Sequence, residues 1–131
     1  MERISSRLPG WAVWGPAAGF YFTALFHRNA LGVAALDAEA RLGITASQLA
    51  VMSSLQLALY VAMQVPAGLA ADRLGPRRTL AIGLVLMGAG ELAFATATTL
   101  PAAIAGRGLI GVGDACIFLN VLRLAHSWFP A

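Results

Sequence analysis

Residues 68–78 read GLAADRLGPRR and separate two long apolar segments. The stretch contains two glycines, one carboxylate and three arginines: Gly68, Asp72, Arg73, Gly75, Arg77 and Arg78. A glycine lets two helices approach closely, and Gly75 followed by Pro76 favours a turn. Asp72 and the arginines can form a charge network that stabilises one packing arrangement of the helices and is broken in another arrangement. The alternative is an ordinary basic loop at a membrane surface.

The apolar segments on both sides of this stretch are long enough to cross a bilayer, because a membrane-spanning helix needs about 20 apolar residues. Hydrophobic residues make up 59% of the 131 residues and charged residues 11%. An ordinary soluble domain has roughly 25% charged residues. We therefore predict an all-α polytopic membrane protein in which residues 1–131 form a single membrane domain. Its four transmembrane helices are expected at about residues 16–36, 47–69, 79–97 and 100–124. Thr45 and Gln48 form a capping-box pattern at the start of the second helix.

The basic residues indicate how these spans are oriented, and all nine are arginines. If the helices alternate in direction, six of them fall on one side of the membrane: Arg3, Arg7, Arg73, Arg77, Arg78 and Arg123. The opposite side has Arg41 together with Asp37 and Glu39. Because cytoplasmic loops carry an excess of basic residues, both chain ends are predicted to be cytoplasmic. The predicted location is the plasma (inner) membrane, with multiple passes.

The residue types in the chain exclude several functional classes. The single cysteine, Cys116, excludes a disulfide scaffold, and the apolar content excludes a disordered chain. The sequence contains no metal-ligand cluster, no phosphate-binding loop and no nucleophile accompanied by a histidine and a carboxylate. We therefore expect no enzyme activity, no cofactor, no metal site and no nucleic-acid partner. The lipid bilayer is an expected partner.

Polar residues inside the predicted spans mark a candidate substrate site. Arg28, Gln56 and Asp114 each lie within about 5 Å of the middle of their spans along the helix axis. A charge at bilayer depth costs several kcal/mol, so it usually faces a bundle interior or a water-filled cavity. The candidate substrate-binding residues are Arg28, Tyr21, Gln56, Tyr60 and Asp114. The second span carries a polar stripe, for which the alternative role is hydrogen bonding between neighbouring helices: Ser53, Gln56, Tyr60 and Gln64.

Further ionisable residues inside the spans are Glu91, Arg107 and His27. Glu91 is expected to pair with Arg107 on the next helix. His27 precedes Arg28, and an imidazole titrates near physiological pH, which would allow a role in ion coupling. The alternative for His27 is a packing or hydrogen-bonding role.

The stretch at residues 68–78 resembles the loop signature of the major facilitator superfamily, a large family of secondary transporters. The matching positions are Gly68, Asp72, Arg73, Gly75, Arg77 and Arg78. Pro76 departs from the signature, in which a basic residue is common at this position. Arg107, Gly111 and Gly113 are similar to the arginine-and-glycine pattern of the family's fourth helix. The resemblance covers the whole chain.

This resemblance implies that residues 68–78 act as a conformational latch on the cytoplasmic side. It also implies a cavity bordered by the first, second and fourth helices, with the third helix outside. Residues 21–34 look like the first helix of the organic-anion and sugar-phosphate branch, whose members are anion:cation symporters. In that branch an arginine in the cavity, here Arg28, attracts an anionic group. An acidic residue is common at the position of Asp114.

The family usually has twelve helices built from repeats of three. Four helices would thus be the amino-terminal fragment of a secondary active transporter. Such a transporter moves a small solute, here an organic anion, by alternating access with a coupling ion such as a proton. The missing transporter helices, or self-association, would complete the cavity. The alternative is a complete four-helix membrane protein, either a small dimeric exporter or a structural subunit of a complex.

Overall fold

The computed structural model describes residues 9–33 and 35–128, and within them the chain contains helices and no strand. The helices are α1 (Gly10–Val33), α2 (Ala35–Leu42), α3 (Ala46–Ala62), α4 (Gln64–Leu74), α5 (Pro76–Thr96) and α6 (Leu100–Trp128). The all-α prediction therefore holds for the described residues. Arg3 and Arg7, which the topology prediction uses, lie outside them.

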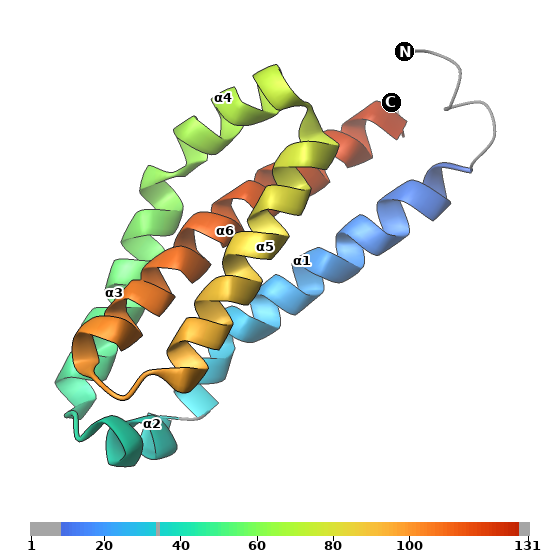
Figure 1. Ribbon diagram of the computed structural model, residues 1–131. Coiled ribbons are helices and arrows are strands. Elements are labelled where there is room, and N and C mark those ends of the chain that lie inside the picture. The colour runs from blue at the N-terminus through green and yellow to red at the C-terminus, as the bar shows by residue number, and fades with distance from the viewer. Residues whose placement is uncertain (1–8, 34, 129–131) are drawn as a thin grey trace.

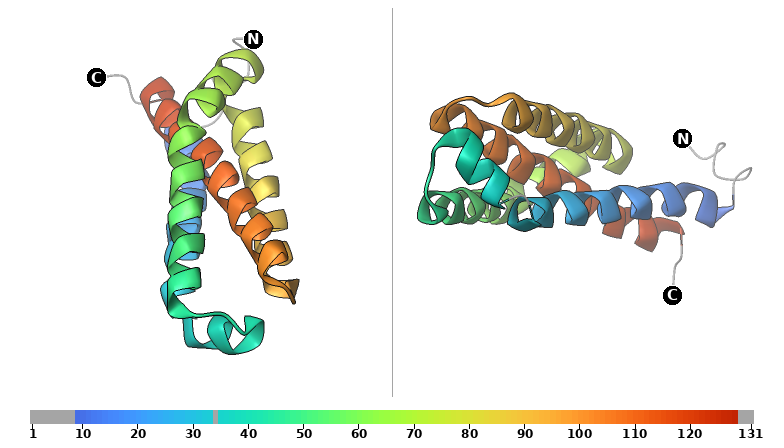
Figure 2. Two further views of the ribbon diagram at one scale, coloured as in Figure 1. Left: turned by 90° about the vertical axis from the view of Figure 1, so that its left-hand side faces the viewer. Right: turned by 90° about the horizontal axis from the view of Figure 1, so that it is seen from below.

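α6 is the central helix of the bundle, because it packs against α1, α3, α4 and α5. The start of α1, the junction between α4 and α5, and the end of α6 lie at one end of the bundle (Figures 1 and 2). α2 and the connection from α5 to α6 lie at the opposite end. Arg73, Arg77 and Arg123 thus share one end of the molecule, whereas Arg41 belongs to α2 at the other.

The boundaries of the first helix differ from the predicted 16–36. α1 begins earlier, at Gly10, and ends at Val33, and a separate short helix, α2, follows over Ala35–Leu42. Asp37, Glu39 and Arg41 make α2 polar, so it does not continue the apolar span. The third and fourth predicted helices agree more closely, since α5 covers Pro76–Thr96 and α6 covers Leu100–Trp128.

The prediction of one continuous second helix over 47–69 is wrong, because the helix is interrupted at Met63. Pro66 explains the interruption: it has no backbone N–H to donate to the carbonyl of Ala62, four residues earlier. The capping box at Thr45 and Gln48 is confirmed at the start of α3. α4 continues to Leu74, so Asp72 and Arg73 are helical residues and not part of a loop.

Gly75 makes the turn between α4 and α5. Its φ of 85° lies in the left-handed region that favours glycine, and its N–H donates to the carbonyl of Ala71, which ends α4. Pro76 then occupies the first turn of α5, where its missing N–H leaves no hydrogen bond unmade. The predicted turn at Gly75 and Pro76 is therefore confirmed.

Two of the described helices are long and apolar enough to cross a membrane, at Pro76–Thr96 and Leu100–His126. A third span results if α2 and α3, which are bent by 111° relative to each other, are counted as one. α3 by itself has only 17 residues because of the break at Met63. In α1, the polar residues His27, Arg28 and Asn29 lower the mean hydropathy. The count of four spans is therefore not confirmed by length and composition.

Glycines at the contact between α5 and α6 let the two helix backbones approach closely. They recur seven residues apart on each helix: Gly83 and Gly90 on α5, Gly106 and Gly113 on α6. A Cβ atom added at Gly90 would lie 2.8 Å from the carbonyl oxygen of Gly106 and from the backbone N of Ile110. Neither backbone atom can move aside cheaply, so this contact requires glycine.

We predict that Gly90→Ala lowers the free energy of unfolding by about 1–3 kcal/mol through overpacking. Gly88→Ala is the matched control on the same helix, because a Cβ there meets nothing within 4 Å. It should be neutral or stabilise the helix by up to about 1 kcal/mol. Thermal unfolding of both variants in detergent, followed by circular dichroism, measures the difference. Equal effects of the two substitutions would contradict the close contact.

Candidate functional site

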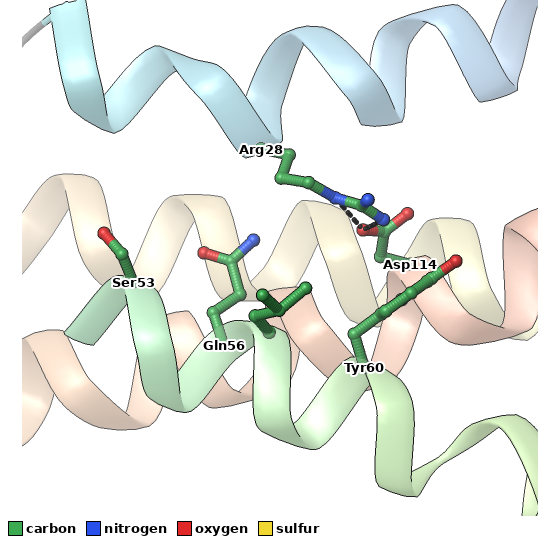
Figure 3. A pocket seen from close by; sticks show the side chains of 6 residues that line it. Arg28, Ser53, Gln56, Tyr60 and Asp114 are labelled. Atoms are coloured by element: carbon green, nitrogen blue, oxygen red, sulfur yellow. Dashed lines mark hydrogen bonds and ion pairs between the residues drawn. The ribbon is translucent and has the colours of Figure 1, made fainter. Parts of the chain in front are cut away.

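A cavity of about 140 Å³ lies between α1, α3 and α6 (Figure 3). The residues that line it are Arg28, Ser53, Gln56, Leu57, Tyr60 and Asp114. Four of the five predicted substrate-binding residues are among them, and Ser53 belongs to the predicted polar stripe. α5 contributes none of the lining residues, in agreement with the expectation that the third span lies outside the cavity.

Arg28 and Asp114 form an ion pair across this cavity. The Arg28 Nε donates to Asp114 Oδ2 at 2.9 Å, and Nη2 donates to the same oxygen. The Asp114 side chain is only 2% exposed, whereas that of Arg28 is 28% exposed. Because a buried carboxylate without a partner is costly, this pair ties α1 to α6.

Tyr60 supports the guanidinium of Arg28 from α3. The guanidinium carbon lies 4.3 Å from the centroid of the Tyr60 ring, which is a cation–π geometry. Phe118 on α6 lies beside Tyr60, with the ring centroids 6.3 Å apart. Tyr21 is not among the residues that line the cavity; its ring packs on Phe118 at 5.4 Å. The structure thus places Tyr60 in the cavity lining and Tyr21 against Phe118, outside the lining.

The two glycines of the fourth-helix pattern bring α6 close to two different neighbours. A Cβ added at Gly111 would lie 2.5 Å from the backbone oxygen of Gln56 on α3. A Cβ added at Gly113 would lie 2.6 Å from the backbone oxygen of Gly83 on α5. Gly111 therefore positions the cavity residue Gln56 against α6, while Gly113 belongs to the α5–α6 contact.

Arg107, the first residue of the same pattern, is buried and contacts Gln56. Its Nη1 donates to Gln56 Oε1 at 3.1 Å, and its guanidinium carbon lies 4.1 Å from the centroid of the Phe94 ring. The expected salt bridge between Arg107 and Glu91 does not occur among the described residues. Glu91 instead faces α1, where its Oε1 lies 3.3 Å from His27 Nδ1.

A second cavity, of about 300 Å³, lies among α1, α2, α5 and α6, and its charged lining residues are Asp37, Arg41, Glu91 and Arg107. Arg41 donates from Nη1 to the carbonyl of Ala95 at 2.6 Å and from Nη2 to that of Phe94 at 3.0 Å. These carbonyls belong to the last turn of α5, where a cation is favourable. The sequence pattern indicated no role for Arg41 beyond topology, because its acceptors are backbone atoms more than 50 residues away.

The predicted latch residues contact α6 through Asp72. Arg123 Nη1 donates to Asp72 Oδ1 at 2.5 Å, and Gly68 leaves room for Leu119 and Arg123. Arg73, Arg77 and Arg78 are exposed and form no ion pair within the described residues. The partner of Asp72 is thus an arginine of α6 and not one of the neighbouring arginines in residues 68–78.

Comparison with known proteins identifies the family. Residues 17–131 match the model of the Major Facilitator Superfamily, and the chain belongs to this family. It is therefore related to transporters rather than to enzymes, and it is a multi-pass membrane protein. The match extends from the first turns of α1 to the end of the chain, so it includes every residue of the cavity and of residues 68–78.

Several curated relatives are named as transporters. The chain is 29% identical over 129 residues to a probable sulfoacetate transporter, SauU, of Cupriavidus necator, covering 98% of this chain and 29% of that protein. It is 32% identical over 103 residues to the D-galactonate transporter of Escherichia coli, covering 79% of this chain and 24% of that protein. It is 31% identical over 88 residues to the nitrate/nitrite transporter NrtP of Picosynechococcus, covering 67% of this chain and 16% of that protein. The chain thus spans less than a third of the length of these relatives, and no solved structure matches it.

We predict that Asp72 and Arg123 are coupled by no more than about 1 kcal/mol, because the pair is at the surface. Asp72→Arg or Arg123→Asp alone should lower the melting temperature in detergent, and the double exchange should restore most of it. Arg73→Gln is the control and should have no effect, because Arg73 forms no ion pair with the other residues that the structure describes. Additive effects of the two exchanges would contradict the pairing.

Proposed function

We propose that this chain forms the first helices of a secondary active transporter that moves a small organic anion across the plasma membrane by alternating access. The observation that carries this proposal is the position of Arg28, which faces a cavity between α1, α3 and α6. An arginine in a membrane-embedded cavity attracts an anionic group and offers several N–H donors to it. The names of the relatives, which include sulfoacetate, D-galactonate and nitrate, support an anionic substrate.

Arg28 can bind an anion without leaving Asp114. Its hydrogen bonds from Nε and Nη2 go to the same oxygen of Asp114. A guanidinium carries five N–H donors in one plane, so donors beyond these two can reach an oxygen of the substrate. Tyr60, stacked on the guanidinium, keeps its plane directed across the cavity.

The charges of the site suggest that a proton is the coupling ion. Arg28 and Asp114 together carry no net charge, so an added anion would leave the cavity with one uncompensated negative charge. A proton on Asp114 removes that charge, so the cavity that holds both the anion and the proton is neutral. Binding of the anion and binding of the proton therefore favour each other, as a symporter requires.

The latch and the topology fit this proposal. Asp72 and Arg123 join α4 to α6 at the end of the bundle that also carries Arg73, Arg77 and Arg78. An excess of arginines at this end favours a cytoplasmic location under the positive-inside rule, with α1, α3 together with α4, α5 and α6 as four spans. We propose that the Asp72–Arg123 pair forms when the cytoplasmic side is packed closed and breaks when it opens.

The remaining wall of the cavity has to come from further helices. Relatives of this chain are more than three times as long, and their additional helices would face the open side of α1 and α3. We propose such helices as the partner, and self-association as the second way to close the cavity. The family match and the named transporters favour a transporter fragment over a small dimeric exporter or a structural subunit of a complex.

We predict that Arg28→Ala, introduced into the native gene, lowers uptake of the transported anion by about 10–100-fold, which corresponds to the loss of a charge-assisted hydrogen bond. Uptake of labelled sulfoacetate, D-galactonate and nitrate by whole cells measures this. Asn29→Ala is the control, because Asn29 is exposed and bonds only to the carbonyl of Leu25 on its own helix. Equal uptake in the Arg28→Ala and wild-type cells, with equal amounts of protein in the membrane, would contradict the anion site.

We predict that uptake by the wild type rises as the external pH falls, because protonation of Asp114 neutralises the charge that the bound anion adds to the cavity. Asp114→Asn mimics the protonated carboxyl group. This variant should lose accumulation driven by a proton gradient but keep exchange of labelled for unlabelled anion, and its uptake should not change with pH. Proton-driven accumulation that survives Asp114→Asn would show that another group carries the proton.

A further inference from the structure

The side-chain amide of Gln56 has a defined orientation. Gln56 is 5% exposed, and its Oε1 accepts a hydrogen bond from Arg107 Nη1 at 3.1 Å. A guanidinium has N–H donors and no acceptor, so only the oxygen of the amide can face it. Arg107 therefore determines which end of the Gln56 amide points toward α6 and which end points away.

The amide nitrogen of Gln56 consequently faces the cavity. In Figure 3, this nitrogen lies on the side of Arg28 and Asp114, and the oxygen is turned away from them. Among the described residues Nε2 is buried and has no hydrogen-bond partner. An amide N–H donor that is buried without a partner carries an energetic penalty, which an acceptor atom on a bound ligand would remove.

Arg107 is held firmly enough to impose this orientation. It is only 2% exposed, and its guanidinium lies over the ring of Phe94. Gly111, one turn further along α6, allows the backbone of Gln56 to approach the helix. The donor and the acceptor are thus both fixed by packing, and the amide has little freedom to turn around.

We propose that Arg107 is a positioning residue that orients Gln56 so that its Nε2 donates to an oxygen of the substrate's anionic group beside Arg28. This inference rests on the proposed anion site and specifies which anionic groups that site selects. The Arg28 guanidinium and Gln56 Nε2 both offer donors, so the site recognises a group with at least two acceptor oxygens on one atom, such as a carboxylate or a sulfonate. With the opposite orientation, Gln56 would present an oxygen that repels this group.

The first test is Gln56→Met, which removes the amide donor and keeps the size of the side chain. The KM for an anion with Arg28-dependent uptake, among sulfoacetate, D-galactonate and nitrate, should rise by about tenfold or more, the cost of one unmade hydrogen bond. Gln64→Met is the matched control, because the Nε2 of Gln64 is also buried without a partner but does not line the cavity. An unchanged KM in Gln56→Met would overturn the proposal.

The second test separates positioning from a structural role of Arg107. Arg107→Met should raise the KM by a similar factor in the wild type and have no further effect on KM in the Gln56→Met background, because no donor is left to orient. Arg107→Lys, which keeps a donor for Gln56 Oε1, should restore a KM close to that of the wild type. Equal effects of Arg107→Met on KM in both backgrounds would mean that Arg107 supports the bundle in general and would overturn the positioning role. Should Arg107→Met not reach the membrane, a KM for Arg107→Lys as high as that for Gln56→Met would overturn it.

These outcomes are distinct from a failure of the proposed function. If Arg28→Ala lowers uptake but Gln56→Met leaves the KM unchanged, the anion site stands and the role of Gln56 and Arg107 is wrong. If no Arg28-dependent uptake of the three anions occurs, the anion site itself is wrong and this inference falls with it.

Discussion

The bond between Arg28 and Asp114 is the interaction on which the arrangement of this bundle depends. A charge inside a membrane needs a partner, and here the partners come from α1 and α6, 86 residues apart in the sequence. The bond therefore fixes the depth of α1 against the central helix. It also pairs one positive with one negative charge, which is the basis of the proposed coupling of anion and proton. One contact thus links the packing of the helices to the proposed coupling.

α6 can occupy the centre of the bundle because its glycines allow close contacts in more than one direction. Gly106 and Gly113 face α5, and Gly111 faces α3. The residues between them are then free to be polar: Arg107 reaches Gln56, and Asp114 reaches Arg28. Small residues and buried charges alternate along one helix, which explains how a charged residue at membrane depth is brought within hydrogen-bond distance of its partner.

The fold was largely predictable because hydropathy and turn residues are local signals. The apolar stretches of α5 and α6, the capping box at Thr45 and the turn at Gly75 all depend on neighbouring residues, and all were predicted. The interruption at Met63 was missed, although Pro66 was a local signal for it. Length and hydropathy alone do not give the number of spans, because the polar residues of α1 and the break after α3 lower the hydropathy and the helix length on which the prediction depends.

The sequence by itself determined that this is a helical membrane protein with polar residues within its apolar helices. It also determined the family, because the spacing within residues 68–78 and around Arg107 is a property of the chain alone. Only the tertiary structure decided the partners: Asp72 pairs with Arg123, Glu91 with His27, and Gln56 with Arg107. Helical periodicity predicts the face of the helix on which a side chain lies. The partner of that side chain depends on the depth and rotation of another helix, and these are set by packing between residues that are far apart in the sequence.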